Sequence, residues 1–230
     1  MSEDLSALKD FSGTARLFPL PNLVLFPFVI QPLHIFEPRY RQMTADALAD
    51  DRLIALVLPQ PGWETEYKSR PLLHAVACLG RIVADQRLED GRYNLLLRGL
   101  SRARIVEELE TDTPYRSAKV ELLQETVSLP PHAQQHLRAA LGRQVPDWFP
   151  EQAQLLDQFQ KLLQSDLPLG ALCDIFSFAL PLEVEFKQQL LEETDVERRV
   201  RHLLEQLKTQ GPPTASAAST RSFPPGFSDN

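Results

Sequence analysis

The stretch LFPLPNLVLFPFVIQPLHIFEPRY, Leu17–Tyr40, constrains the fold more than any other part of the sequence. Its first 20 residues contain no Asp, Glu, Lys or Arg, so we expect them to be buried. About 20 apolar residues could cross a bilayer as a helix. However, four prolines among these 20 residues each remove a backbone donor and oppose helix continuation, and in lipid the freed carbonyls would lack partners. The stretch therefore predicts the entry of a β-rich core, and no membrane span. We expect its extended segments at Arg16–Leu20, Leu23–Phe26 and Leu33–Phe36.

The residues that follow predict a β-domain with one helix. Pro38 suits the first position of that helix, which we expect over Pro38–Ala49 because its apolar residues have helical spacing. Asp90-Gly91 is a hairpin turn signal, and Gly80 is a plausible bulge. The further strands are expected at Leu53–Leu58, Leu72–Ala84, Tyr93–Arg98, Arg102–Glu110 and Tyr115–Leu123.

The hydrophobic period changes from 2 to 3.6 after a boundary at Val127–Pro131, which predicts a helical domain. The last helix has a start signal, with Thr194 as N-cap and Glu197 three residues later. Its apolar stripe is explained by packing within the helical domain or by docking onto a partner helix. The expected helices are His132–Val145, Pro150–Gln164, Leu169–Leu180, Leu182–Glu192 and Asp195–Thr209.

These patterns predict an α+β protein in three parts. A β-domain covers residues 13–126, and an α-helical bundle covers 127–210. The Pro/Ser/Ala-rich tail, 211–230, is expected to be disordered and dispensable for folding, because it has only Phe223 and Phe227 to bury.

Three stretches in order carry a family resemblance. FPL, VLFP and PLHIFEPRYRQM in the opening, then LGRIVADQRLEDGRYNLLLRGLSRARI (Leu79–Ile105), then LPLEVEFKQQLLEETDVERRVRHLLEQL (Leu180–Leu207), resemble the N-terminal, substrate-binding domain of the ATP-dependent Lon proteases. The resemblance spans roughly Ala15 to Leu207 and implies a PUA-like, twisted and partly closed β-domain followed by an α-helical bundle. Free-standing bacterial proteins and cereblon-type proteins share this domain. A fold alone does not fix a function.

Charge and cysteine content indicate which partners and which cell compartment to expect. The formal net charge is −7, and from Gly13 to Glu125 there are 14 basic against 15 acidic residues. That balance lacks the positive excess needed to neutralise a phosphate backbone, so a nucleic-acid partner is not expected. Cys78 and Cys173 lie in separate apolar runs and are expected to be buried thiols, which fits a reducing cytoplasm. The first ten residues, MSEDLSALKD, carry no signal-peptide pattern, and we expect a cytoplasmic protein.

No motif predicts catalysis, a metal or a cofactor. None of the nine glycines is followed by Lys, so there is no phosphate-binding GxxxxGK[ST] loop. The sequence also shows no Ser–Lys peptidase domain and no GxSxG elbow, so we expect no ATP-dependent proteolysis. His132 and His136 stand four apart but have no third ligand, which favours exposed helix histidines. The paired CxxC motifs of the cereblon-type zinc domain are absent, because there are only two cysteines.

Trp63 and Tyr67 are the candidate binding residues. They lie in the aperiodic loop PQPGWETEYKSRP between Pro59 and Pro71, and loops on a rigid scaffold are where binding residues concentrate. Trp63 either folds back over the core as a lid or is exposed and anchors unstructured polypeptide.

Two further hypotheses concern arginines. Four arginines have even residue numbers on two expected strands and could therefore lie on one sheet face: Arg92, Arg98, Arg102 and Arg104. That face would either bind RNA or be a solvated surface whose positive charge is balanced by nearby acidic residues. The family's GxxR pattern, here Gly99 and Arg102, favours a structural role for Arg102. We predict that Arg102 pairs with Glu37, since a charge near a core needs a partner.

The sequence thus predicts a non-catalytic module that binds exposed apolar segments of unfolded proteins, as an adaptor or in protein quality control. The alternatives are an RNA-binding PUA-like module and an enzyme with an unrecognised site.

Overall fold

The structure is a computed structural model that describes residues 8–63, 70–149 and 153–211. The chain divides into two compact units, the first extending to Leu123 and the second beginning at Gln124. This division falls three residues before the predicted one. Thr126 belongs with the helices because its N–H donates to the Thr194 carbonyl at 3.0 Å. Residues of the predicted tail beyond Gly211 lie outside the described residues.

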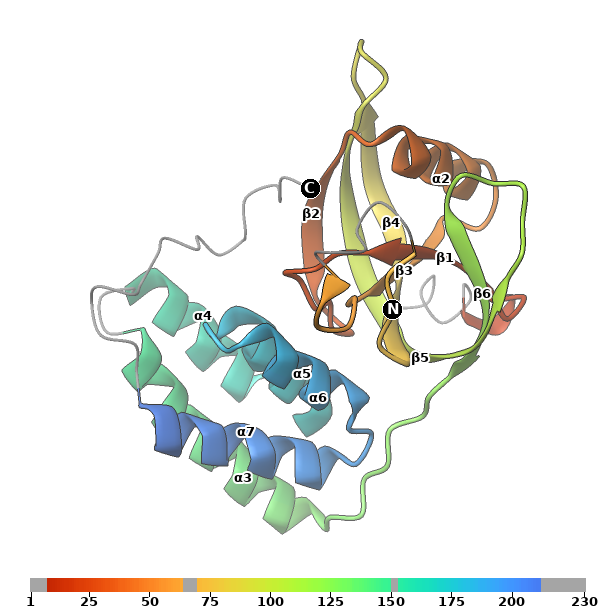
Figure 1. Cartoon of the computed structure of the whole chain (residues 1–230). Helices are drawn as coiled ribbons and strands as arrows, with labels where there is room; N and C mark the ends of the chain where they lie inside the picture. Colours follow the sequence, from red (N-terminus) through yellow and green to blue (C-terminus); the bar gives the residue numbers. More distant parts are fainter. Residues whose placement is uncertain (1–7, 64–69, 150–152, 212–230) are drawn as a thin grey trace. The chain divides into compact units, whose positions relative to one another are not determined.

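The first unit contains one six-stranded mixed sheet and a helix, α2 (Pro38–Ala49) (Figure 1). The predicted helix has these same bounds. Its strands are β1 (Thr14–Pro19), β2 (Ile30–Ile35), β3 (Leu53–Val57), β4 (Val76–Arg87), β5 (Tyr93–Leu109) and β6 (Arg116–Leu122).

The sheet closes on itself. Its strand order is β2-β5-β4-β3-β1-β6, and β5 also pairs with β6. The second half of β5, from Ala103 to Leu109, pairs with β6, while its first half, from Tyr93 to Arg98, pairs with β2. β2 is therefore an additional strand beside a closed ring of five. The interior of that ring is filled by alternate small and aliphatic residues: Ala15, Leu17, Leu53, Ala55, Val57, Ala77, Leu79, Ala103, Ala118 and Val120.

Bulges interrupt the alternation of side chains along β4 and β5. The register skips Leu100 and Val106 in β5 and Val83 in β4, and an extra residue of this kind shifts every later side chain to the other face. The two strands predicted at Tyr93–Arg98 and Arg102–Glu110 are in fact one strand that bends at such a bulge.

The opening stretch is mostly but not entirely buried, which corrects the prediction made from its lack of charge. Val24, Leu25 and Phe26 are buried, although the segment predicted as extended at Leu23–Phe26 forms no strand. Phe28 is 51% exposed and Ile30 is 39% exposed. Absence of charge permits burial, but the partner surface decides it.

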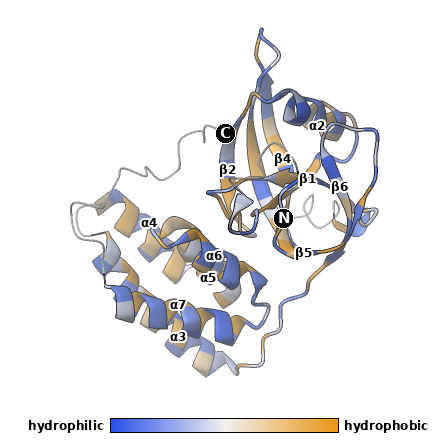
Figure 2. Ribbon diagram, viewed as in Figure 1, coloured by the Kyte–Doolittle hydropathy of each residue, from blue (hydrophilic) through white to orange (hydrophobic). Residues whose placement is uncertain are grey.

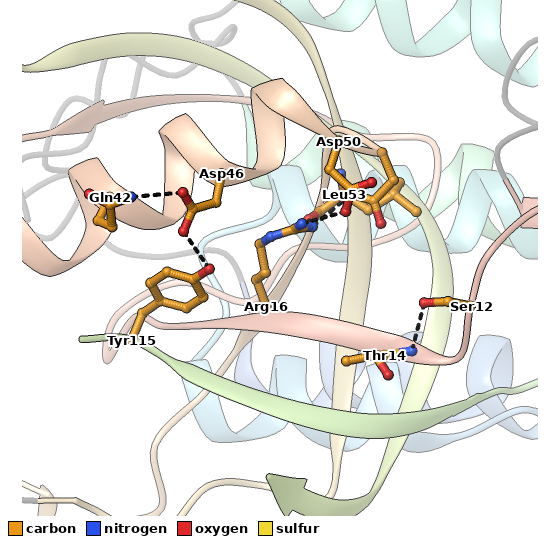
Figure 3. A network of polar contacts seen from close by, with 9 residues as sticks. Ser12, Thr14, Arg16, Gln42, Asp46, Asp50, Leu53 and Tyr115 are labelled. Carbon is orange, nitrogen blue, oxygen red and sulfur yellow. Dashed lines mark hydrogen bonds and ion pairs between the residues drawn. The ribbon is translucent and has the colours of Figure 1, made fainter. Parts of the chain in front are cut away.

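Polar contacts anchor α2 to the sheet (Figure 3). Arg16 of β1 pairs with Asp50 at 2.6 Å and with Asp51 at 2.7 Å, just after the helix. Within the helix, Asp46 accepts a hydrogen bond of 2.7 Å from the Tyr115 hydroxyl. Burial raises the pKa of Tyr115, and the bond to Asp46 raises that pKa further.

The second unit consists of helices whose apolar faces pack together. Along α7, hydrophobic residues alternate with polar ones (Figure 2), and Val196, Val200, Leu203, Leu204 and Leu207 are all buried. The elements are α3 (Pro131–Gln144), the 3-10 helix η2 (Val145–Trp148), α4 (Ala153–Gln164), α5 (Leu169–Ala179), α6 (Val184–Glu192) and α7 (Val196–Gln210).

A buried arginine crosslinks this unit. Arg199 of α7 is fully buried and lies 3.2 Å from Asp174 of α5, which is also fully buried. Arg199 also donates to the Glu193 carbonyl at 2.7 Å and pairs with Glu125 in the segment before the helices. One guanidinium group thus fixes two helices and the start of the unit.

The start of α7 corrects one prediction. The N-cap is Asp195, whose carboxylate accepts a 3.0 Å bond from the Arg198 N–H, and not Thr194. The carbonyl of Thr194 is instead engaged by Thr126. Glu193 caps the Asp195 N–H at 2.9 Å. No helix among the described residues is long and apolar enough to cross a membrane.

Candidate functional site

The outer surface of strands β2, β5 and β4 is apolar along one row. Pro32 lies opposite Leu96, and Leu96 lies opposite Ala84. These side chains face away from the buried side of the three strands, which is the side that Leu33 and Leu97 occupy. We call this surface the outer face. It comprises Ile30, Pro32, Val83, Ala84 and Leu96, and Phe28, two residues before Ile30, is counted with it.

Exposure is what distinguishes the outer face from ordinary core. Among the described residues, six large hydrophobic side chains are exposed, and three of them lie here: Phe28 at 51%, Ile30 at 39% and Val83 at 38%. The other three are Leu72 in a loop, Val106 at a bulge and Val127 in the segment that precedes α3 in the second unit. Isolated exposed apolar residues are ordinary, whereas a group on one surface indicates interaction.

Phe28 is exposed because of its backbone. Its φ is +68°, a left-handed conformation that is uncommon for residues other than Gly and a cost for an aromatic residue. Hydrogen bonds hold it there: the Phe28 N–H donates to the Gly99 carbonyl at 3.0 Å, and the Val29 N–H donates to the Phe26 carbonyl at 3.3 Å. The Gly99 N–H in turn donates to the Val29 carbonyl at 2.8 Å.

Gly99 permits this contact by lacking a side chain. A Cβ atom at this position would lie 2.1 Å from the Phe26 carbonyl oxygen. The loop of Phe26–Phe28 can therefore sit directly on β5 only where β5 has glycine.

The two ends of the outer face differ in charge. At the Phe28 end, Ile30, Arg98 and Arg81 form one row across the three strands. At the other end, the ring of His34 lies 2.7 Å from the Asn94 side-chain oxygen and 3.3 Å from an Arg92 nitrogen. The apolar row is thus bounded by guanidinium groups on one side and a polar cluster on the other.

The predicted binding residues lie elsewhere in the first unit. Trp63 is half-buried at the end of a described segment, and Tyr67 lies outside the described residues. The base of their loop is fixed, since the Gln60 N–H donates to the Leu72 carbonyl at 2.8 Å and Arg116 donates to the Pro71 carbonyl at 2.7 Å. Trp63 belongs to this loop and not to the strands of the outer face, and its role in binding stays a prediction.

A small hollow lies beside the base of that loop. Prolines and two tyrosines line it, with guanidinium groups at its edge: Pro19, Arg39, Tyr40, Pro59, Pro71, Pro114, Tyr115 and Arg116. Arg39 lies over the Tyr40 ring at 4.5 Å, and Arg116 pairs with Glu108. The walls of the hollow are therefore held by their own contacts.

The strand register does not decide the predicted pairing of Glu37 with Arg102. Glu37 precedes α2 and its carboxylate lies 2.9 Å from Arg39, whereas Arg102 is buried in β5 opposite Cys78. Ile35 lies opposite Tyr93, nine residues before Arg102 on the same strand. The pairing stays a prediction, and a double-mutant cycle with Glu37→Gln and Arg102→Met would test it, since a coupling below about 0.5 kcal/mol would refute contact.

The four arginines of shared parity do not form one face, which corrects the proposed RNA-binding surface. The bulge at Leu100 breaks the alternation, so that Arg102 is buried. Arg104 is exposed beside Glu121 at 3.8 Å, and Arg92 pairs with Asp90 at 2.6 Å.

The described residues contain no group of three His, Cys, Asp or Glu side chains that could hold a metal ion. The rings of His132 and His136 lie edge to face, 6.4 Å apart. Cys78 and Cys173 are both buried, one in each unit.

The outer face was not predicted from the sequence, because the backbone conformation of Phe28 has no sequence signal. The alternation of Ile30, Pro32 and His34 with buried residues is visible in hindsight, because His34 and Pro32 mark the exposed phase of β2. Phe28 carries no such mark, since left-handed backbone is expected at Gly or Asn.

Comparison with known proteins identifies the fold's relatives. Residues 14–209 match the family of the ATP-dependent protease La (LON) substrate-binding domain. Lon protease of Dictyoglomus thermophilum is 28% identical over 201 residues, covering 86% of this chain and 24% of that protein. Lon protease of Syntrophus aciditrophicus is 30% identical over 189 residues, covering 81% and 24% respectively. The chain thus spans about a quarter of the length of these relatives.

Two solved structures share the architecture. The Lon N-terminal domain protein from Xanthomonas campestris superposes with a TM-score of 0.60 at 25% identity, covering 86% of this chain and 99% of that one. The N-terminal domain of the Mycobacterium avium complex Lon protease gives a TM-score of 0.67 at 18% identity with the same coverage, which supports the fold alone. The α+β fold and the family resemblance seen in the sequence are both confirmed, and the chain belongs to the Lon substrate-binding domain family.

Proposed function

We propose that this chain is a binding module whose outer face takes exposed apolar segments of other proteins. The observation that carries the proposal is Phe28, an aromatic side chain that is 51% exposed and held in a costly backbone conformation by three hydrogen bonds around Gly99. Strain of this kind persists where the surrounding structure enforces it, often at binding sites. The family is described as substrate-binding, which supports the same function.

The shape of the outer face suits an extended polypeptide. Apart from Phe28, its apolar side chains come from three neighbouring strands, whose register places them side by side. Aromatic and branched side chains on such a surface can contact apolar residues of many sequences. As the cellular role, we propose that the protein is an adaptor in protein quality control in the cytoplasm.

The test uses a client protein that is kept unfolded. Reduced and carboxamidomethylated α-lactalbumin, fluorescently labelled, would be titrated with the whole chain and with Phe28→Asn. Asparagine tolerates left-handed backbone better than other residues, so this substitution removes the aromatic ring and relieves strain together. We expect client binding to weaken by about 1–3 kcal/mol, while the melting temperature stays level or rises.

The matched control is Leu72→Asn, since Leu72 is 69% exposed and lies outside the outer face. It should leave client affinity unchanged. Equal affinity of the wild type and Phe28→Asn, or an equal loss in both variants, would refute the outer face as the client site.

A further inference from the structure

We propose that a client binds at the outer face as an added β-strand, which runs antiparallel along the open edge of β2. Its backbone pairs with the backbone of Ile30, Pro32 and His34, and its alternate side chains extend the apolar row of the outer face by one strand. The inference rests on the proposed function. It adds the conformation of the client and the backbone groups that bind it.

The strand β2 lies at the end of the sheet. Among the described strands it is the one with a single neighbour, β5, because the other five strands close into a ring. Figure 1 shows β2 at the margin of the sheet. Among the described residues, no backbone hydrogen bond reaches Ile30 or His34 from the side away from β5. One edge of β2 is therefore open to another strand.

The hydrogen bond at Val29 shows which backbone groups face this edge. The Val29 carbonyl accepts from the Gly99 N–H at 2.8 Å, so it points toward β5. In an antiparallel ladder, successive residues direct their backbone groups to opposite sides. The backbone groups of Ile30, Pro32 and His34 therefore point to the open edge. Pro32 agrees with this phase, since a proline nitrogen facing β5 would remove a bond from the ladder.

The open edge offers two donors and three acceptors. The donors are the N–H groups of Ile30 and His34, and the acceptors are the carbonyls of these two residues and of Pro32. The Pro32 carbonyl also accepts a 2.7 Å bond from the Gln31 side-chain nitrogen, and its second lone pair remains for a client N–H. An extended client presents one N–H and one carbonyl on the same side at every second residue. Its backbone thus matches the edge.

An antiparallel strand on this edge also places its side chains on the outer face. Directly opposed residues of two strands point to the same face of a sheet. The client residues that pair with Ile30, Pro32 and His34 therefore project beside those side chains. Ile30 is 39% exposed, and Pro32 and His34 are half-buried. One set of client residues thus supplies both the hydrogen bonds and the apolar contacts.

Pro32 protects this edge against a second copy of the chain more than against a client. Native edge strands are usually blocked by Lys, other charges, Pro or bulges, and β2, IQPLHI, contains no charged residue. If two β2 edges paired, both strands would lack the donor at Pro32, and each would direct a carbonyl at the proline ring of the other. A client strand without proline meets one such ring. The edge therefore favours a client over self-pairing.

The experiment compares three labelled nine-residue peptides by fluorescence anisotropy with the whole chain. Each has three Leu residues alternating with Thr between terminal Lys residues. The first is unmodified, the second is N-methylated at the three Leu residues, and the third is N-methylated at three Thr residues. N-methylation removes a donor and affects pairing only where that nitrogen faces the edge. We expect the second peptide to bind at least about 10-fold more weakly than the first, and the third to bind within about 2-fold of it.

A pair of variants assigns the binding to β2. His34→Pro removes one of the two donors of the edge. His34→Thr is the matched control, because it also loses the ring that lies 2.7 Å from the Asn94 side-chain oxygen but keeps the N–H. We expect His34→Pro to bind the first peptide about 3- to 10-fold more weakly than His34→Thr. Circular dichroism melting shows whether each variant is folded, and the peptide comparison with the wild type stands without them.

The outcomes separate the two proposals. Equal binding of the three peptides, or equal loss in both methylated ones, would refute the added strand, and weaker binding of unfolded α-lactalbumin by Phe28→Asn would leave the proposed function standing. A larger loss for the Thr-methylated peptide would overturn the antiparallel pairing. A wild-type dimer that dissociates as the first peptide binds, measured by sedimentation, would assign the edge to a second copy and overturn the inference. Failure of every peptide and of unfolded α-lactalbumin to bind would overturn both proposals.

Discussion

Replacing Gly99 with alanine should unseat the loop that presents Phe28. The new Cβ would lie 2.1 Å from the Phe26 carbonyl oxygen and 2.8 Å from its carbon, whereas carbon and oxygen normally stay about 3.3 Å apart. The loop must therefore move by roughly 1 Å. Both hydrogen bonds between Gly99 and the loop then weaken, at about 0.5–1.5 kcal/mol each, and overpacking adds about 1–3 kcal/mol. We expect the first unit to lose about 2–4 kcal/mol of stability.

Urea unfolding would measure this loss. Trp63 lies in the first unit and Trp148 in the second, so a Trp148→Phe background lets fluorescence report on the first unit alone. Gly142→Ala in α3 is the control, read from Trp148 in a Trp63→Phe background because α3 belongs to the second unit. Its Cβ would meet only the end of the Leu163 side chain at 3.2 Å, and alanine favours a helix by about 1 kcal/mol over glycine. A loss below about 0.5 kcal/mol for Gly99→Ala would refute the claim that Gly99 fixes the Phe28 loop.

Three further predictions follow from single contacts. Arg199→Met should destabilise the second unit by about 3–5 kcal/mol, measured by urea unfolding, because it leaves the buried Asp174 without the guanidinium group; a loss under about 1 kcal/mol would contradict the crosslink. Trp63→Ala should weaken binding of unfolded α-lactalbumin by about 1–3 kcal/mol at an unchanged melting temperature, whereas unchanged affinity with a large fall in stability would make Trp63 a core residue. The raised pKa of Tyr115 contributes stability that is present below the unfolded value of about 10 and is lost as pH rises through the folded value. Tyr115→Phe should therefore lower stability at pH 7, by loss of the bond to Asp46, yet show a shallower decline above pH 10; equal slopes in both proteins would refute this.

Elements whose cause is local could be predicted from the sequence. α2 has the predicted bounds because Pro38 can only open a helix and the period of Tyr40, Met43 and Ala47 continues to its end. The change of period near residue 127 separates strands from helices for the same reason. The N-cap of α7 was missed by one residue, since Thr194 and Asp195 are both good caps and only the contact with Thr126 decides between them.

The bulges could not be predicted, because a bulge is a property of two strands. Leu100, Val83 and Val106 are ordinary strand residues, and nothing in their identity shows that the opposite strand skips them. Yet the skip at Leu100 decides that Arg102 is buried while Arg98 faces outward beside Arg81. Parity counted through an undetected bulge therefore predicted a row of arginines that the sheet does not form.

Phe28 shows why an apolar sequence does not by itself distinguish core from binding surface. Its neighbours Phe26 and Val29 are buried and it is not, though all three belong to one uncharged stretch. Left-handed backbone at a residue other than glycine costs on the order of 1 kcal/mol or more, and exposing an aromatic ring forgoes the stability its burial would add. A sequence selected for stability alone would place asparagine or glycine at this position. The presence of phenylalanine is explained if the ring contacts a client. Phe28→Asn tests this directly, because we expect it to raise the stability of the first unit and to weaken client binding.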